Sequence, residues 1–293
     1  MPTLRELKNR LQGVKTTGKL AGAMRTVSTA KYSRAAALKR QSAPYSEAAS
    51  LLYERAAEAL GKPKKKKKDG RPKRRRDDGF ADEAALPRPV VVLVSGNKGL
   101  SGGCDHELFA FFAKALEEYD GPLVITRGRK AAEFAKEKLL EVMRDMPAQD
   151  VPAYSEAAEL ADMLTALYED GSASSIDVCF MHAHNMLKRE PVMQRFLPKQ
   201  AHASGPENAA VKPIFVPDAK TVKKRLMPEL RTAELYSWLL DSACAVQSAT
   251  LVAMRSAYDN ASAQAELLET AINRRRQQEV TSSVLETSSG MSV

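Results

Sequence analysis

The chain has 293 residues, of which 44% are hydrophobic and 6% aromatic, so it can bury the core of one large or two modest domains. Its three cysteines are widely spaced and form no CxxC pair, which argues against a disulfide framework and against a zinc site. No apolar run approaches the roughly 18 residues of a membrane span, and the segment MPTLRELKNR lacks the apolar core of a signal peptide, so we expect a soluble protein.

The net charge of +9 is concentrated in one short segment. Lys62–Arg76 (KPKKKKKDGRPKRRR) carries eleven basic residues and one aspartate, a net charge of +10, which leaves −1 (+9 minus +10) for the rest of the chain. Such a segment suits a nucleic-acid surface or a basic localisation signal, but it has no aromatic residue that could stack on bases. Because glycines and prolines flank it, we interpret residues 61–89 as a solvated surface loop.

Residues 1–60 are predicted to form one long helix of a coiled coil. Thr3 and Glu6 have the spacing of an N-terminal capping box, and Pro44 is expected to kink or restart the helix. Three glycines each cost about 1 kcal/mol of helix propensity relative to alanine, so we expect a close partner helix at Gly13, Gly18 and Gly22. Apolar and small residues recur at steps of three and four: Leu4, Leu7, Leu11, Val14, Gly18, Ala21, Met24 and Val27.

Residues 90–217 change to alternating strands and helices. Strands are expected at 90–94 (VVVLV), 123–126 and 176–181, with an edge strand at 191–197. Helices are expected at 105–119, 130–142 and 155–169, the last with Ser155 as N-cap and Gly171 as its stop. This alternation predicts a small Rossmann-like α/β domain with a mostly parallel sheet, followed by a linker over 198–217.

Residues 218–293 are predicted to form the second long helix. After Pro228 this stretch has no proline, and its only glycine is Gly290. Apolar residues follow one narrow stripe from Leu226 to Ile272, which is typical of a coiled-coil seam. The predicted fold is therefore an antiparallel coiled coil of the two terminal helices with an inserted α/β domain near one end, which leaves the other end as a bare rod.

Three stretches are candidates for chemistry. Ser95–Gly103 (SGNKGLSGG) lies between a strand and a helix, as phosphate loops do, but it matches neither GxxxxGK[ST] nor GxGxxG, so we favour a tight turn with positive φ angles. His182 and His184 point to one face of a strand, and without two further ligands at zinc spacing we favour a structural role. Residues 274–278 (RRRQQ) lie near the end of the last helix, either as a solvated face with favourable charges near the C-terminus or, as we favour, as the surface of an exposed rod that engages a partner.

Four segments then resemble the gamma subunit of F-type ATP synthase, the central rotor shaft. Ala23–Lys31 (AMRTVSTAK) is similar to the family's AM-x-MV-x-AAK, and Ser95–Gly103 is similar to its S-x-x-RGL-CGG turn. Val252–Ala261 (VAMRSAYDNA) resembles VAMK-x-ATDNA, and Ile272–Thr281 (INRRRQQEVT) resembles YNKARQ-x-x-IT at the family's spacing. The resemblance covers nearly the whole chain.

The resemblance implies a coupling subunit without catalytic residues, cofactor or metal of its own. The coiled coil would stand inside a ring of three alpha and three beta subunits, and the α/β domain would rest on the membrane c-ring together with the epsilon subunit. Met24 would face the lower levers of beta, while Arg276, Gln277 and Thr281 would contact its catch loop. The complex would sit on the cytoplasmic face of the bacterial plasma membrane, where it couples hydrogen ion transport to ATP synthesis.

Two alternatives belong to other functional classes. A basic nucleic-acid-binding protein built on a coiled coil would use Lys62–Arg76 as its binding surface. A small α/β enzyme with helical arms would need to bind a ligand at Gly96–Gly103.

Overall fold

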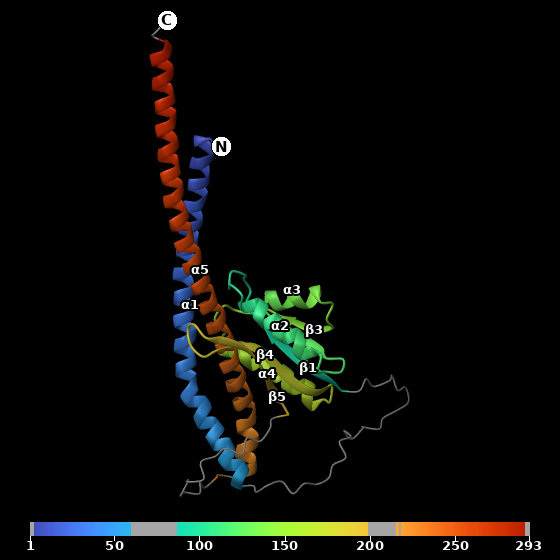
Figure 1. Ribbon diagram of the computed structural model, residues 1–293. Helices are drawn as coiled ribbons and strands as arrows, with labels where there is room; N and C mark the ends of the chain where they lie inside the picture. Colours follow the sequence, from blue (N-terminus) through green and yellow to red (C-terminus); the bar gives the residue numbers. More distant parts are fainter. Residues whose placement is uncertain (1–2, 60–86, 199–214, 217, 291–293) are drawn as a thin grey trace.

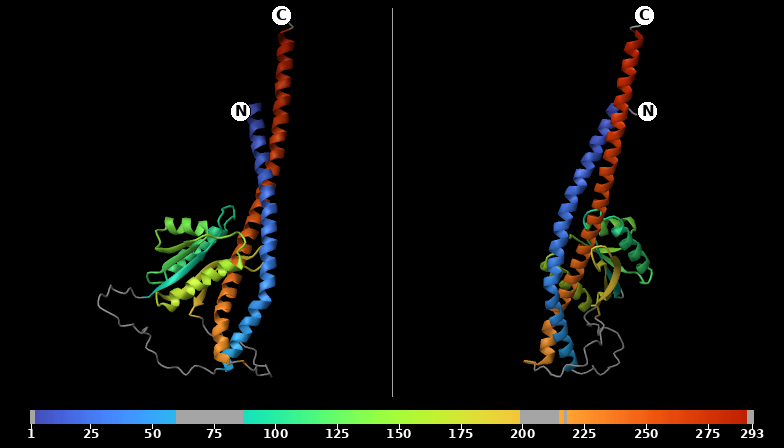
Figure 2. Two further views of the ribbon diagram at one scale, coloured as in Figure 1. Left: turned by 180° about the vertical axis from the view of Figure 1, so that it is seen from behind. Right: turned by 60° about the vertical axis from the view of Figure 1, so that its left-hand side comes forward.

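The computed structural model describes residues 3–59, 87–198, 215–216 and 218–290. Two long helices, α1 (Leu4–Ala59) and α5 (Ala219–Gly290), run side by side in opposite directions along one rod (Figures 1 and 2). An α/β domain packs beside the lower part of the rod, and the upper end of α5 extends beyond the start of α1 (Figure 1). The predicted fold class is confirmed. The basic segment Lys62–Arg76 lies outside the described residues, as does most of the predicted linker.

The first helix begins as its sequence predicts. The backbone N–H of Thr3 donates to Glu6 Oε2 at 2.8 Å, and the N–H of Glu6 donates to Thr3 Oγ1 at 3.3 Å, which is the reciprocal pattern of a capping box. The helix then continues through Pro44, so of the two outcomes expected there, a kink or a restart, the restart is wrong. Because α1 packs on α5 along its length, tertiary contacts offset the one backbone hydrogen bond that a proline removes.

Two of the three glycines in α1 mark a close approach of the helices. A Cβ atom added to Gly18 would lie 3.3 Å from the Cβ of Ala261, and one added to Gly22 would lie 3.5 Å from the ring of Tyr258. The prediction of a close partner is therefore confirmed at these two positions. It is wrong at Gly13, where nothing lies within 4 Å of an added Cβ.

The apolar stripe of α5 is narrow only in its upper half. From residue 251 onward the buried positions are spaced as in a coiled-coil seam: Met254, Ala261, Leu268 and Ile272. Between Leu230 and Thr250 the helix is buried on nearly all sides, because it packs against α1 and the α/β domain together. The prediction of a narrow stripe is wrong for this lower half, which belongs to the core of the domain.

The α/β domain contains a five-stranded sheet in the order β3-β2-β1-β4-β5. The strands are β1 (Arg88–Val94), β2 (Leu123–Arg127), β3 (Val142–Met146), β4 (Ala173–Ala183) and β5 (Arg189–Leu197). The first four are parallel and β5 is an edge strand, as predicted; it pairs antiparallel with β4. The connecting helices are α2 (Cys104–Leu116), α3 (Arg129–Glu137) and α4 (Tyr154–Glu169), which gives the crossover pattern of a Rossmann-like sheet.

Two local predictions in this domain are wrong. The helix expected over 130–142 ends at Glu137, and residue 142 begins β3, whose exposed side chains provide no apolar run to indicate a strand. Ser155 does not cap α4: the N-cap is Ala153, which makes no side-chain hydrogen bond, and Ser155 lies in the first turn. Gly171 does end this helix, with a φ of 76° that favours glycine.

Both faces of the sheet are covered, and α5 contributes to both cores. On one face α4 and α5 pack against β1 and β4, with Trp238 stacked on Phe180 at a ring-centroid distance of 5.6 Å. On the other face α2 and α3 pack against the sheet, and α5 adds Ala245 and Ala249. Because apolar burial stabilises by about 25 cal/mol per Å², this shared core fixes the α/β domain firmly on α5.

Candidate functional site

The glycine-rich segment Ser95–Gly103 forms the turn between β1 and α2. Leu100 and Gly102 have φ angles of 73° and 60°, so the preferred prediction of a turn with positive φ is confirmed. Leu100 is a non-glycine residue in this region, and its side chain is 57% exposed. The turn therefore holds an exposed apolar side chain at its tip.

The polar groups of this turn cap a neighbouring helix. Ser95 Oγ accepts the backbone N–H of Ala131 at 2.7 Å, Asn97 Oδ1 accepts that of Arg129 at 3.2 Å, and the carbonyl of Gly96 accepts that of Lys130 at 3.2 Å. These three N–H groups open α3 and would otherwise be free for an anion. Since the turn itself occupies them, its geometry serves helix capping.

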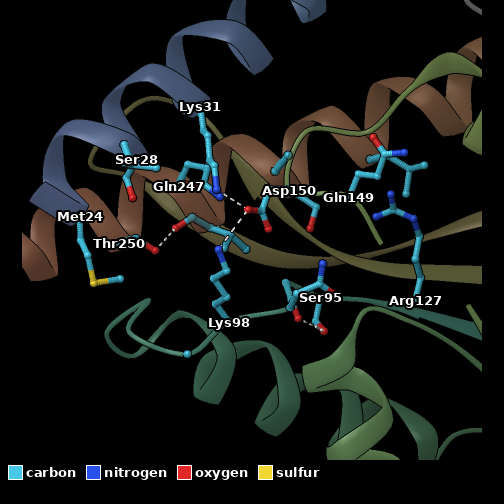
Figure 3. Close-up of a pocket in the computed structure, with 18 of the residues that line it drawn as sticks. Met24, Ser28, Lys31, Ser95, Lys98, Arg127, Gln149, Asp150, Gln247 and Thr250 are labelled. Atoms are coloured by element: carbon cyan, nitrogen blue, oxygen red, sulfur yellow. Dashed lines mark hydrogen bonds and ion pairs between the residues drawn. The ribbon is translucent and has the colours of Figure 1, made fainter. Parts of the chain in front are cut away.

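A cavity of about 230 Å³ lies where this turn meets the coiled coil (Figure 3). Its walls come from α1, α5, the start of the glycine turn and the segment before α4. The predicted contact residue Met24 lines it from α1, and Gln247 and Thr250 line it from α5 (Figure 3). The turn nevertheless touches α5, since a Cβ atom added to Gly96 would lie 3.1 Å from the side chain of Val246, so the open space lies mainly on the α1 side.

One carboxylate in the cavity joins three parts of the chain. Asp150 accepts a hydrogen bond from Lys31 of α1 and lies 3.6 Å from the ammonium of Lys98 in the glycine turn (Figure 3). Partial burial alone would raise the pKa of Asp150, but the hydrogen bond from Lys31 and the charges of both lysines together lower that pKa below its ordinary value. Asp150 is therefore a stable anion at neutral pH.

A second carboxylate, Asp241 of α5, is buried where α1, α5 and β4 meet. It forms an ion pair with Lys39 of α1 and lies 3.0 Å from Nδ1 of His182 in β4. Its side chain is only 6% exposed, and the partners satisfy its two oxygens. This arrangement meets the requirement that a buried charge be paired and hydrogen-bonded.

His182 in β4 and His184 just beyond its end lie on the same side, as predicted from their spacing. Their rings meet edge to face with centroids 4.7 Å apart. Each has its own carboxylate partner: His182 contacts Asp241, and His184 Nε2 lies 2.7 Å from Glu190. Across the described ranges, no group of three or more His, Cys, Asp or Glu side chains is placed to hold a metal ion.

The other predicted contact residues lie far from Met24. Arg276, Gln277 and Thr281 are exposed on the upper part of α5, and Thr281 Oγ1 donates to the carbonyl of Gln277 at 2.9 Å. Met24 lies beside α5 near Tyr258, because Gly22, two residues before Met24 in α1, contacts the Tyr258 ring. The 18 residues from there to Arg276 correspond to roughly 27 Å of helix. The structure brings Arg276, Gln277 and Thr281 together and leaves Met24 at a lower level.

Sequence reasoning missed Asp150 and Asp241. Asp241 could have been noticed, because a single acid within the apolar run LYSWLLDSACAV predicts a buried, paired charge. Asp150 has no such signal, since it lies in a polar segment whose partners are 119 and 52 positions away in sequence.

The matches to known proteins cover almost the full length of this chain. The family model described as ATP synthase matches residues 3–293. The ATP synthase gamma chain of Pelotomaculum thermopropionicum is 26% identical over 292 residues, which cover 98% of this chain and 97% of that one. The ATP synthase gamma chain of Rubrobacter xylanophilus is 26% identical over 298 residues, which cover 99% and 98% of the two chains.

Solved structures share the fold at lower sequence identity. A chain from the Euglena gracilis mitochondrial ATP synthase, in the OSCP/F1/c-ring structure, aligns with a TM-score of 0.63 at 14% identity, covering 99% of this chain and 93% of that one. A chain from the Tetrahymena thermophila mitochondrial ATP synthase central stalk and c-ring aligns with a TM-score of 0.57 at 14% identity, covering 81% and 99%. Within the described residues, no helix is long and apolar enough to cross a membrane.

Proposed function

Because this chain belongs to the ATP synthase gamma-chain family, we propose that it is the central-stalk rotor that couples transmembrane proton flow to ATP synthesis and hydrolysis. The observation that carries the proposal is the shape of the molecule. An α/β domain is fixed on the lower half of α5, and the upper end of α5 stands free of both that domain and α1 (Figure 2). In such a molecule, torque applied to the α/β domain can be transmitted along the rod to partners that contact the free end of α5.

The proposed mechanism follows from the uneven cross-section of the rod. At the level of Gly18 two helices are in close contact, whereas α5 continues alone above the start of α1 (Figure 1). A shaft of this kind presents a different face to each of the three surrounding beta subunits. Each catalytic site is then biased toward a different conformation by its own contacts with the shaft, and rotation exchanges these biases.

In this proposal the chain is not the catalyst, because the catalytic residues belong to the beta subunits. Met24 contacts the lower part of the alpha/beta ring, and Arg276, Gln277 and Thr281 contact beta at a higher level. The exposure of the last three side chains on a projecting helix supports this assignment. The α/β domain faces the membrane c-ring and the epsilon subunit, so the chain is held peripherally at the cytoplasmic face of the bacterial membrane.

The family membership favours the rotor over a nucleic-acid-binding coiled coil, since the matched relatives are ATP synthase gamma chains along their whole length. A deletion of residues 62–76 separates the two functions. A rotor without this segment assembles almost normally with alpha and beta subunits, whereas a nucleic-acid-binding protein loses its partner.

Co-expression with alpha and beta subunits tests the proposed function directly. We expect a stable complex with ATPase activity to purify with this chain. If the chain stays outside the complex, the rotor assignment is wrong.

A further inference from the structure

The α1 helix lies against the α/β domain over a short stretch around Ala35. Lys31, Ala35 and Lys39 are spaced by four positions and therefore lie on one face of α1. Ala35 is fully buried in the hydrophobic cluster that contains β1, β4 and α5 residues; Lys31 pairs with Asp150 of the α/β domain, and Lys39 pairs with Asp241 of α5. By contrast, α5 contributes many side chains to both cores of the domain. The two helices of the rod are thus attached to the domain in different ways.

At the upper end of this stretch the attachment crosses an open space. The cavity of about 230 Å³ lies between α1 and the segments that contain Lys98 and Asp150. Lys31 reaches Asp150 across it (Figure 3), and their side chains are 28% and 26% exposed. Because the cavity is open, the ion pair is a direct connection between α1 and the domain across it.

The carboxylate is held rigidly on the domain side. Asn97 of the glycine turn donates its Nδ2 hydrogen to the carbonyl of Ala148, two residues before Asp150. The Oδ1 of the same side chain accepts the N–H of Arg129 at the start of α3. Lys98 lies 3.6 Å from Asp150 on the other side. The segment that carries the carboxylate is therefore anchored to the glycine turn, which in turn caps α3, while Lys31 reaches it on a flexible side chain.

We propose that Asp150 is a positioning residue that fixes α1 relative to the α/β domain through Lys31, so that torque applied to the domain reaches both helices of the rod. This inference rests on the proposed rotor function. Without the ion pair, torque would still reach α5 through its apolar cores, but α1 could shift over the cavity. The upper rod would then lag behind the domain under load.

The test uses the whole ATP synthase complex assembled with Asp150→Asn, Lys31→Met or both. The measured quantity is the rate of proton-driven ATP synthesis divided by the rate of ATP hydrolysis by the detached alpha/beta/gamma complex, with the melting temperature of that complex as a check on folding. Glu141→Gln is the matched control, because the Arg88–Glu141 pair, at 2.7 Å, lies within the α/β domain and does not reach the rod.

We expect each single variant to lower the ratio about two- to fivefold, as suits one partly exposed ion pair, and the double variant to lower it no further. Glu141→Gln should leave it unchanged, and Asp150→Glu should restore most of it. An unchanged ratio in Lys31→Met, or an equal loss in Glu141→Gln, would overturn the proposal. If Asp150→Asn does not assemble, Lys31→Met decides alone. Failure of the unmodified chain to assemble would instead contradict the rotor function.

Discussion

Gly18 of α1 faces Ala261 of α5 so closely that a Cβ atom on Gly18 would lie 3.3 Å from the Cβ of Ala261. Gly18 is buried at this contact, although glycine costs about 1 kcal/mol of helix propensity relative to alanine. The close approach keeps the rod thin above the α/β domain, which a shaft inside a ring requires.

Replacing Gly18 with leucine should separate the helices and lower the free energy of unfolding by about 1–3 kcal/mol, because a large side chain overpacks a filled contact. Gly13→Leu is the matched control, since nothing lies within 4 Å of its added Cβ. It should stabilise by about 0.5–1 kcal/mol through helix propensity. Urea unfolding measures both, and equal effects of the two variants would contradict the close contact.

Asp241→Ala should destabilise the chain by about 2–3 kcal/mol. The change removes a buried carboxylate and leaves Lys39 and His182 without their partner, although each of these is about one-third exposed and regains some hydration. Glu269→Ala serves as the control, because its ion pair with Lys15 also joins α1 to α5 but leaves both side chains about half exposed, at 49% and 47%, so about 0.5 kcal/mol is expected. Comparable losses in the two variants would show that Asp241 is not a buried junction.

Two glycines with positive φ should differ in their tolerance of alanine. At Gly128, with φ of 100°, an added Cβ would clash with the backbone carbonyl of Ser95, so we expect a loss of about 3 kcal/mol or more. At Gly171, with φ of 76°, nothing lies within 4 Å, so only the strain of about 1–2 kcal/mol remains. Thermal unfolding of both variants tests the close approach of the two βα turns.

The three cysteines should react slowly with maleimide in the native chain and rapidly in urea. Burial raises the pKa of Cys104 and of Cys179 to about 12 and that of Cys244 to about 11, so the thiolate is scarce at neutral pH. These buried neutral thiols stabilise the folded chain fully below their unfolded pKa of about 8.5. This stabilisation is lost as the pH rises from there through 11 to 12. Rapid native labelling at pH 7 would contradict this burial.

Arg276→Ala with Gln277→Ala should lower coupled ATP synthesis about fivefold or more and leave the folding of this chain almost unchanged. Both side chains are exposed on a projecting helix, so their loss removes partner contacts of about 1 kcal/mol or more without opening a core. Synthesis rates in the assembled complex are compared with the melting temperature of the isolated chain. Equal loss of both would assign these residues a merely structural role.

Local pattern was sufficient for most of the elements. The long helices followed from apolar spacing and the scarcity of breakers, the capping box of Thr3 from its spacing to Glu6, and the buried strand β1 from VVVLV. β3 was missed, because an exposed edge strand such as VMRDM has neither an apolar run nor a clean alternation. For the elements that were predicted correctly, the information lies within one turn or one strand of sequence.

The amino-acid sequence by itself determined that two terminal helices pair around an α/β insert, since the period of apolar residues encodes which face is buried. Only the tertiary structure decided that α5 is buried on nearly all sides between Leu230 and Thr250, and that Lys31 and Asp150 meet across a cavity. The physical reason is that an ion pair depends on the distance between two charges, and residues 119 positions apart acquire that distance only when the domain docks on the rod.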